Sequence, residues 1–99
     1  MTNEKINNIQ IKVYFWMPKL GITSNDLLTY AFLYGYEKEK GIPYNGGIAR
    51  LSKIIGLTIR GMRKVLQRLI DKKLILRYDP INVGRNYDYG TNKEMIKHI

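Results

Sequence analysis

The chain has 99 residues, of which 44% are hydrophobic and 25% charged, and its formal net charge is +9. This composition is typical of one small globular domain rather than a disordered chain. The absence of cysteine excludes a disulfide framework and any thiolate metal or redox site. No apolar run reaches the ~18 residues of a membrane span, and the first ten residues lack the apolar core of a signal peptide. We therefore expect a cytoplasmic protein.

The positive charge is concentrated in one part of the chain. Residues 48–77 contain nine basic side chains and one acidic side chain, whereas the rest of the chain holds eight basic and seven acidic ones. A uniformly basic surface would indicate only solubility. A charge confined to one segment instead favours a polyanionic partner.

The N-terminal half predicts a strand and a helix. Residues 9–16 alternate apolar and polar side chains, which indicates a strand that ends before Pro18. A helix is expected over about residues 24–38, because Thr23 offers a hydroxyl N-cap and Asp26 places a carboxylate three residues later. Residues 43–44 are expected to be extended and to bridge to another strand.

Two more helices are expected next, separated by a short turn. Asn45 is the expected N-cap of a helix that ends near Ile55, and Gly56 suits the left-handed position after it. Thr58 is the expected cap of a third helix that runs to about Lys72.

The C-terminal part predicts a β-hairpin. Residues 74–79 and 86–89 flank a loop that contains proline and glycine, and residues 91–99 form a tail. The whole chain, 1–99, is thus expected to be one α+β domain with its core over about 9–90. It would contain three helices, a C-terminal hairpin and an N-terminal strand.

The third helix is expected to have an apolar face and a cationic face. With ~100° of rotation per residue, four apolar side chains fall on one core-facing arc: Met62, Val65, Leu66 and Leu69. The acidic residue of this helix, Asp71, comes only near its end, so the Glu–Lys pairing of solvated helices is missing. Arginine also offers a bidentate fork that solubility does not require. We therefore favour contact with DNA over a merely solvated face.

Residues 48–75 resemble the helix-turn-helix of winged helix-turn-helix domains. In IARLSKIIGLTIRGMRKVLQRLIDKKLI, residues 56–58 match the family's glycine-apolar-hydroxyl turn, and the apolar arc falls on the core positions of its recognition helix. The resemblance covers about residues 16–90 and is closest to the N-terminal domain of phage and plasmid replication initiators and replisome organisers. Two residues depart from the family pattern: Lys73 stands where a glycine is usual, and Gly61 lies inside the recognition helix.

The resemblance implies a recognition helix over about residues 58–72 that enters the major groove, and a wing that reaches the adjacent minor groove or its phosphates. The predicted DNA-binding residues are Thr58, Ile59, Arg60, Arg63, Lys64, Gln67, Arg68, Lys53 and Arg85. Arg60, Arg63, Lys64 and Gln67 would contact base edges or nearby phosphates. Arg77 lies at the base of the wing, whereas the tyrosines of the hairpin are expected to pack rather than to stack on bases.

The first helix is apolar on two sides. Leu28, Phe32 and Tyr36 form a second apolar face beyond the one expected to meet the core. Either the strand at 9–16 folds back over this face, or a homodimer forms through this face and that strand. We favour the homodimer, because small domains rarely leave so large a patch uncovered.

Catalytic chemistry is not expected. His98 is the sole histidine and lies next to the C-terminus, the carboxylates are scattered, and no phosphate-binding loop motif occurs. We expect no enzyme activity, no cofactor, no metal and no membrane partner. The expected function is sequence-specific binding of double-stranded DNA in phage or plasmid replication initiation or transcriptional control. The alternative is a winged-helix adaptor for protein–protein interaction that has no DNA role.

Overall fold

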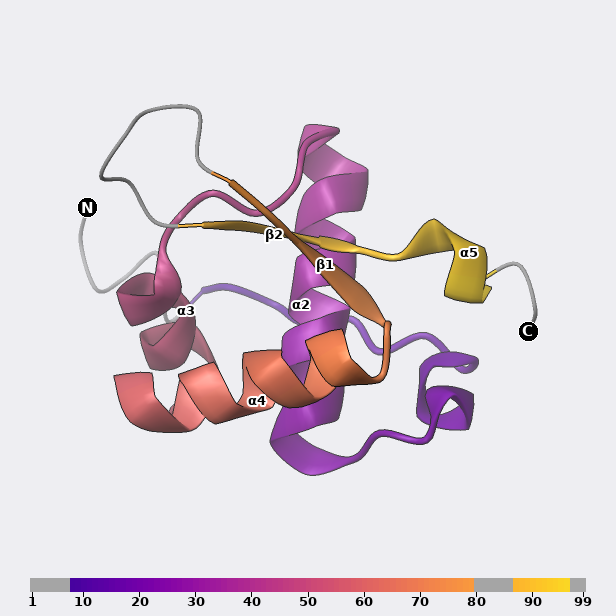
Figure 1. The fold of residues 1–99 in the computed structure, drawn as a ribbon, viewed down its shortest axis with the longest axis horizontal. Coiled ribbons are helices and arrows are strands. Elements are labelled where there is room, and N and C mark those ends of the chain that lie inside the picture. The colour runs from indigo at the N-terminus through magenta and orange to yellow at the C-terminus, as the bar shows by residue number, and fades with distance from the viewer. Residues whose placement is uncertain (1–7, 80–86, 97–99) are drawn as a thin grey trace.

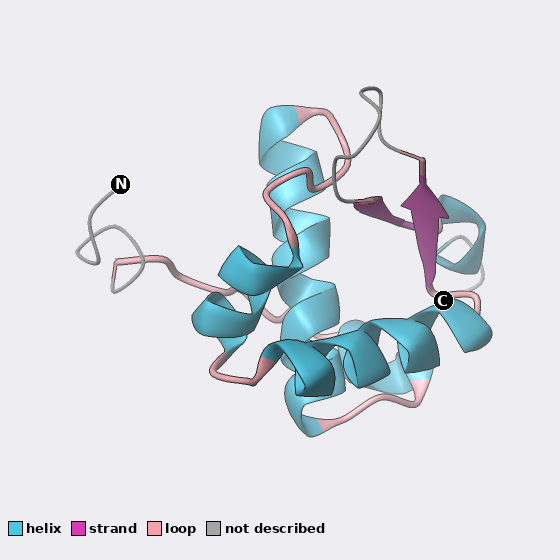
Figure 2. Cartoon of the chain, turned by 60° about the vertical axis from the view of Figure 1, so that its left-hand side comes forward, coloured by secondary structure: helices cyan, strands magenta, loops and turns pink. Residues whose placement is uncertain are grey.

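The computed structural model describes residues 8–79 and 87–96. Its elements follow in the order η1 (Met17–Leu20, a 3-10 helix), α2 (Ser24–Lys40), α3 (Ile48–Ile55), α4 (Ile59–Asp71), β1 (Ile75–Tyr78), β2 (Asp88–Thr91) and α5 (Lys93–Ile96) (Figure 1). The fold is therefore α+β. Figure 2 shows the two strands to one side of the larger helices, not between them.

The helix α2 is the central element of the fold, and it packs against η1, α3, α4 and β2. It begins after the extended residue Thr23, which makes no side-chain cap hydrogen bond. It ends at Gly41, whose φ of 76° lets its N–H donate to the Glu37 carbonyl at 2.8 Å. The expected helix is confirmed and is two residues longer than predicted.

The turn between α3 and α4 forms as the sequence predicts. Gly56 takes the left-handed conformation at φ 90°, and its N–H donates to the Ser52 carbonyl at 2.8 Å. Thr58 caps α4, because its Oγ1 accepts the N–H of Gly61 at 3.0 Å. These caps fix where one helix stops and the next one starts.

The expected N-cap of α3 is wrong, since the helix begins at Ile48 and its N-cap is Gly47 rather than Asn45. Gly47 has a φ of 89°, which favours glycine. Its carbonyl accepts the Tyr44 hydroxyl at 2.8 Å, while the Asn45 side chain accepts the Tyr36 hydroxyl at 2.8 Å. Asn45 is thus engaged with α2 and is not available as a cap.

The hairpin is antiparallel, with a register that runs from Ile75 opposite Thr91 to Tyr78 opposite Asp88. Tyr44 adds a bridge to Tyr89 through two backbone hydrogen bonds of 2.8 and 3.0 Å, which confirms the expected extended segment. The second strand lies further along the chain than residues 86–89. It reaches Thr91, which pairs with Ile75, and the N–H and hydroxyl of Thr91 both donate to the Glu37 carboxylate of α2. The predicted loop at 80–86 lies outside the described residues.

The core lies where α2, α3, α4 and the hairpin meet. The buried apolar side chains are Met17, Ile22, Tyr30, Ala31, Leu33, Tyr44, Leu51, Met62, Val65, Leu66, Leu69, Leu74, Ile75 and Tyr89. All four residues predicted for the apolar arc of α4 belong to this set. Among the described helices, none is both long and apolar enough to cross a membrane.

The expected N-terminal strand is wrong. Residues 9–14 pair with no strand in the described chain, whose sheet has two strands, and a turn at 15–16 leads into η1. The inward face follows the predicted alternation at Ile11, which packs against the core, but not beyond it. Tyr14 and Trp16 pack edge-on against Tyr34 at centroid distances of 5.3 and 5.2 Å. Phe15, which the alternation assigned to the apolar face, is 81% exposed. Aromatic packing onto α2 therefore decides the path of this segment.

Candidate nucleic-acid interface

The helix α4 separates an apolar side from a cationic side. Its buried side chains are Met62, Val65, Leu66 and Leu69, and the first and last of these have no exposed surface. Arg60, Arg63 and Lys64 are exposed on the rest of its circumference. A helix fixed from behind in this way presents its donor side chains on a rigid support.

The basic side chains in the first half of α4 have no protein partner. In the described parts of the chain, Arg60, Arg63 and Lys64 make no ion pair and no side-chain hydrogen bond. Exposed Lys53, in the last turn of α3, is also unpaired within these ranges. Ile59 is 41% exposed at the first position of α4. These residues form a cationic surface around the start of α4.

Arg68 differs from this group. Its Nε and Nη2 donate to the two carboxylate oxygens of Asp26 at 2.9 and 2.7 Å, so the side chain ties α4 to the first turn of α2. The hydrogen bond to Asp26, with the carboxylate charge, raises the pKa of Arg68. Arg68, which the sequence placed among the DNA-binding residues, therefore has an intramolecular partner.

Other polar groups in the second half of α4 are also engaged. The Gln67 amide donates to the Asp71 carboxylate at 2.9 Å, which leaves the Gln67 carbonyl oxygen free to accept. Lys72 donates to the Gly21 carbonyl at 3.2 Å. The cations available to a ligand are thus those near the start of α4, which is the end that recognition helices direct at base edges.

The hairpin contributes a further cation. Arg77 projects from β1, and its guanidinium carbon lies 4.4 Å from the centroid of the Tyr87 ring. This cation–π contact fixes the orientation of the guanidinium group. Arg85, the predicted wing-tip residue, falls outside the described residues.

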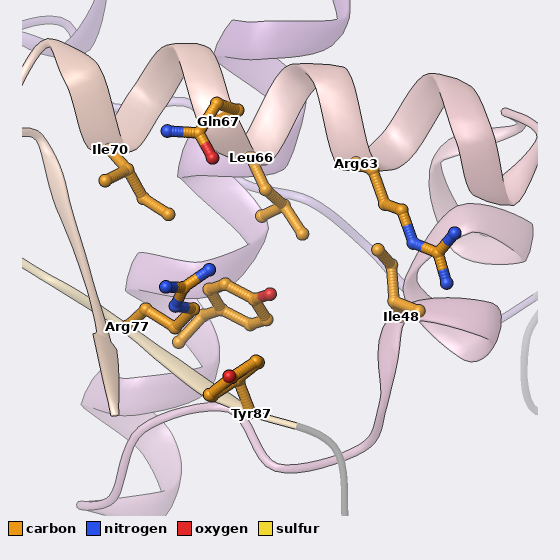
Figure 3. Close-up of a pocket in the computed structure, with 8 residues that line it drawn as sticks. Ile48, Arg63, Leu66, Gln67, Ile70, Arg77 and Tyr87 are labelled. Atoms are coloured by element: carbon orange, nitrogen blue, oxygen red, sulfur yellow. The ribbon is translucent and has the colours of Figure 1, made fainter. Parts of the chain in front are cut away.

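A pocket of about 330 Å³ lies between α4 and the hairpin (Figure 3). Its lining residues are Ile48, Arg63, Leu66, Gln67, Ile70, Arg77, Tyr87 and Tyr89. Burial raises the pKa of Tyr89, and the positive charges of Arg77 and Arg63 partly oppose this rise. Both guanidinium groups therefore lie within electrostatic reach of the Tyr89 hydroxyl.

The sequence did not identify this pocket. Tyr87 directly precedes β2 and is two residues before Tyr89, which lies opposite Arg77 in the ladder. Strand periodicity therefore puts the three residues on one face, but only once the register is known. Within residues 8–79 and 87–96, no three or more His, Asp or Glu side chains lie together in a group that could hold a metal ion.

Three packed helices, of which α3 and α4 form a helix-turn-helix, followed by an antiparallel hairpin that packs against α4, define the winged-helix fold. A solved structure of a mutant of MepR from S. aureus matches 96% of this chain with a TM-score of 0.63 and 22% sequence identity. The match covers 61% of the MepR chain, so this chain spans less than two thirds of that length.

A second solved structure, described as the N-terminal domain of a DNA-binding protein, has a TM-score of 0.59 and 13% identity. That match covers 93% of this chain and 80% of the other. At such identities the likeness shows a shared fold. No protein-family model matches the sequence, and the comparison with curated proteins gives no match.

Proposed function

We propose that this chain binds double-stranded DNA in a sequence-specific manner, with α4 in the major groove and the hairpin at the adjacent minor groove. The observation that carries the proposal is the set of unpaired cations on the exposed side of a helix whose other side is buried: Arg60, Arg63 and Lys64. The likeness to a domain described as part of a DNA-binding protein supports it.

The roles follow from position on the fold. Arg60, Arg63, Lys64 and Gln67 read base edges or contact nearby phosphates, because they lie on the exposed side of α4. Lys53 and Arg85 contact the backbone from α3 and the wing. The Thr58 hydroxyl accepts from Gly61 and can still donate its proton to a phosphate. Ile59 offers an apolar contact to a thymine methyl group.

Arg68 is left out of this set, because its guanidinium group already forms two hydrogen bonds to Asp26. Its role is to hold α4 against α2.

Selection of bound duplexes from a random pool tests sequence specificity. Replacing a base-reading residue should relax the preference, whereas replacing a phosphate-contacting residue should weaken binding to all duplexes alike. We expect Arg60→Ala to do the first and Lys53→Gln the second, with about 1–3 kcal/mol lost for a good base contact. Lys12→Gln, which removes an equal charge from the N-terminal segment, is the control. The assigned recognition face is wrong if Arg60→Ala changes neither affinity nor preference.

The same selection addresses the cellular role. We propose phage or plasmid replication initiation or transcriptional control, which rests on the resemblance of residues 16–90 to initiator domains. Selected sites near a replication origin would support initiation, and sites near promoters would support gene control. The adaptor alternative predicts little affinity for random duplex DNA even at low salt.

A homodimer is part of the proposal, over a smaller surface than the sequence suggested. Phe32 and Tyr36 already pack against Tyr44 of the same chain, at centroid distances of 5.6 and 5.1 Å. Leu28 and Phe15 stay 37% and 81% exposed, so these side chains are the ones a second copy would cover. Sedimentation velocity should show a dimer that Phe15→Ser weakens. Selected sites should then contain inverted half-sites about one turn (~34 Å) apart.

A further inference from the structure

We propose that the pocket between α4 and the hairpin is a seat for one backbone phosphodiester of the bound duplex, held by Arg63 and Arg77. The proposal rests on the proposed function and adds to it a site that the exposed face of α4 does not include. Arg77, Tyr87 and Tyr89 become parts of the DNA interface through this pocket.

The topology of a duplex gives the first reason. A major groove and the adjacent minor groove are separated by one sugar–phosphate backbone. A domain that puts a helix in one groove and a hairpin in the other must therefore straddle that backbone. The pocket lies between these two elements, with Arg63 on α4 and Arg77 on β1 contributing to opposite walls (Figure 3).

The state of Arg77 gives the second reason. Its guanidinium group lies over the Tyr87 ring, with 4.4 Å between the guanidinium carbon and the ring centroid. This cation–π contact uses no oxygen acceptor, so the N–H groups of Arg77 keep their capacity to donate to one. A guanidinium edge matches two phosphate oxygens, and neither Arg77 nor Arg63 has a carboxylate partner within residues 8–79 and 87–96.

The lining of the pocket gives the third reason. The Tyr89 side chain is largely buried and lines the pocket, and its hydroxyl makes no hydrogen bond to another group within residues 8–79 and 87–96. It can donate to a phosphate oxygen between the two arginines. Leu66 and Ile70 supply apolar surface beneath these donors. Apolar walls strengthen the attraction between the guanidinium groups and an anion, because they exclude polarisable water.

The first test compares Arg77→Gln with Lys12→Gln in the full chain, by fluorescence anisotropy on several duplexes. We expect Arg77→Gln to weaken binding about tenfold on all of them. It should also make the slope of log K against log salt less steep by about 0.9, the value of one phosphate contact. Lys12→Gln should keep the wild-type slope. Thermal unfolding of each variant checks that the comparison is between folded proteins.

Tyr87 is a positioning residue in this account, so its ring matters more than its hydroxyl. Tyr87→Leu should reduce both the affinity and the salt slope as Arg77→Gln does. Tyr87→Phe should keep the wild-type affinity and salt slope, because a phenyl ring still makes the cation–π contact with the guanidinium group.

A neutral backbone linkage identifies the ligand directly. A duplex with one methylphosphonate at the seated position should bind the wild-type protein about tenfold less tightly, and Arg77→Gln should lose nothing further on it. If the wild-type protein binds duplex DNA and Arg77→Gln binds it with the same affinity, the phosphate site is wrong and the proposed function still holds. Competition by millimolar inorganic phosphate, with no effect of methylphosphonate at any position, would also overturn the phosphate site in favour of a free-anion site. Failure of the wild-type protein to bind any duplex would remove both proposals.

Discussion

Lys73 occupies a backbone conformation that side chains rarely adopt. Its φ is 62°, and it follows Lys72, the C-cap of α4. Two backbone hydrogen bonds impose this turn, from Lys73 N–H to the Ile70 carbonyl at 2.8 Å and from Leu74 N–H to the Leu69 carbonyl at 3.0 Å. This pair of bonds is the Schellman arrangement, in which glycine is the favoured residue. The departure from the family pattern at this position is therefore a point of local strain.

Glycine at this position should stabilise the protein. We expect Lys73→Gly to raise the free energy of unfolding by about 0.5–1 kcal/mol, because the left-handed conformation costs a side chain roughly that much. Urea denaturation measures the change. Lys73→Ala is the matched control, since it removes the same side chain beyond Cβ but keeps the Cβ that the left-handed conformation disfavours. A loss of stability in Lys73→Gly would show that the lysine side chain contributes more than its strain costs.

The contact between α4 and α2 determines how α4 is held. The Arg68–Asp26 pair has two hydrogen bonds and joins residues from helices that are remote in sequence. The Arg68 side chain is 53% exposed, so water and salt screen much of the attraction.

A double-mutant cycle measures this pair. Asp26→Asn and Arg68→Gln should each lower the urea midpoint slightly, and the double variant should lose less than the sum of the two. The coupling should shrink in high salt. Arg68→Gln should also leave the salt slope of DNA binding unchanged. A less steep salt dependence in that variant would show that Arg68 does contact DNA.

How much the sequence predicts differs from element to element. The periodicity of α4 and the caps at Gly56 and Thr58 are local signals, and the structure confirms them. The strand expected at 9–16 was predicted from alternating apolar and polar residues, but the packing of Tyr14 and Trp16 onto α2 overrode that pattern. The start of α3 depended on which partner Asn45 finds, and that partner is a tyrosine nine residues earlier.

The candidate site shows the same limit. The exposed cations of α4 can be predicted because one helix carries them all. The pairing of Arg68 joins residues 42 positions apart, and the pocket around Arg77 needs the register of the hairpin. Neither is present in a local pattern.

Buried tyrosines make the whole molecule sensitive to alkali. Burial raises the pKa of Tyr44 to about 12, and it also raises the pKa of Tyr30 and Tyr89. A tyrosine that ionises near pH 10 in the unfolded chain but only at higher pH in the fold favours folding below pH 10. That contribution is lost as the pH rises toward 12.

We therefore expect the free energy of unfolding to fall between pH 10 and 12, by on the order of 1 kcal/mol for Tyr44 after allowance for screening. Urea titrations across this range measure the fall. Tyr44→Phe should flatten the dependence, although it also loses the hydrogen bond to Gly47 and is less stable overall. Equal stability at pH 9 and pH 12 would contradict the role of buried tyrosine.

The positive charge of the molecule is concentrated in residues 48–77. The central claim is that this cationic part of the surface binds duplex DNA. Fluorescence anisotropy of wild-type protein on duplex DNA, from 50 to 200 mM salt, tests the claim most directly. Contact with about six phosphates predicts that log K falls against log salt with a slope near −5. No binding at 50 mM salt, or binding whose affinity does not change with salt, would contradict it.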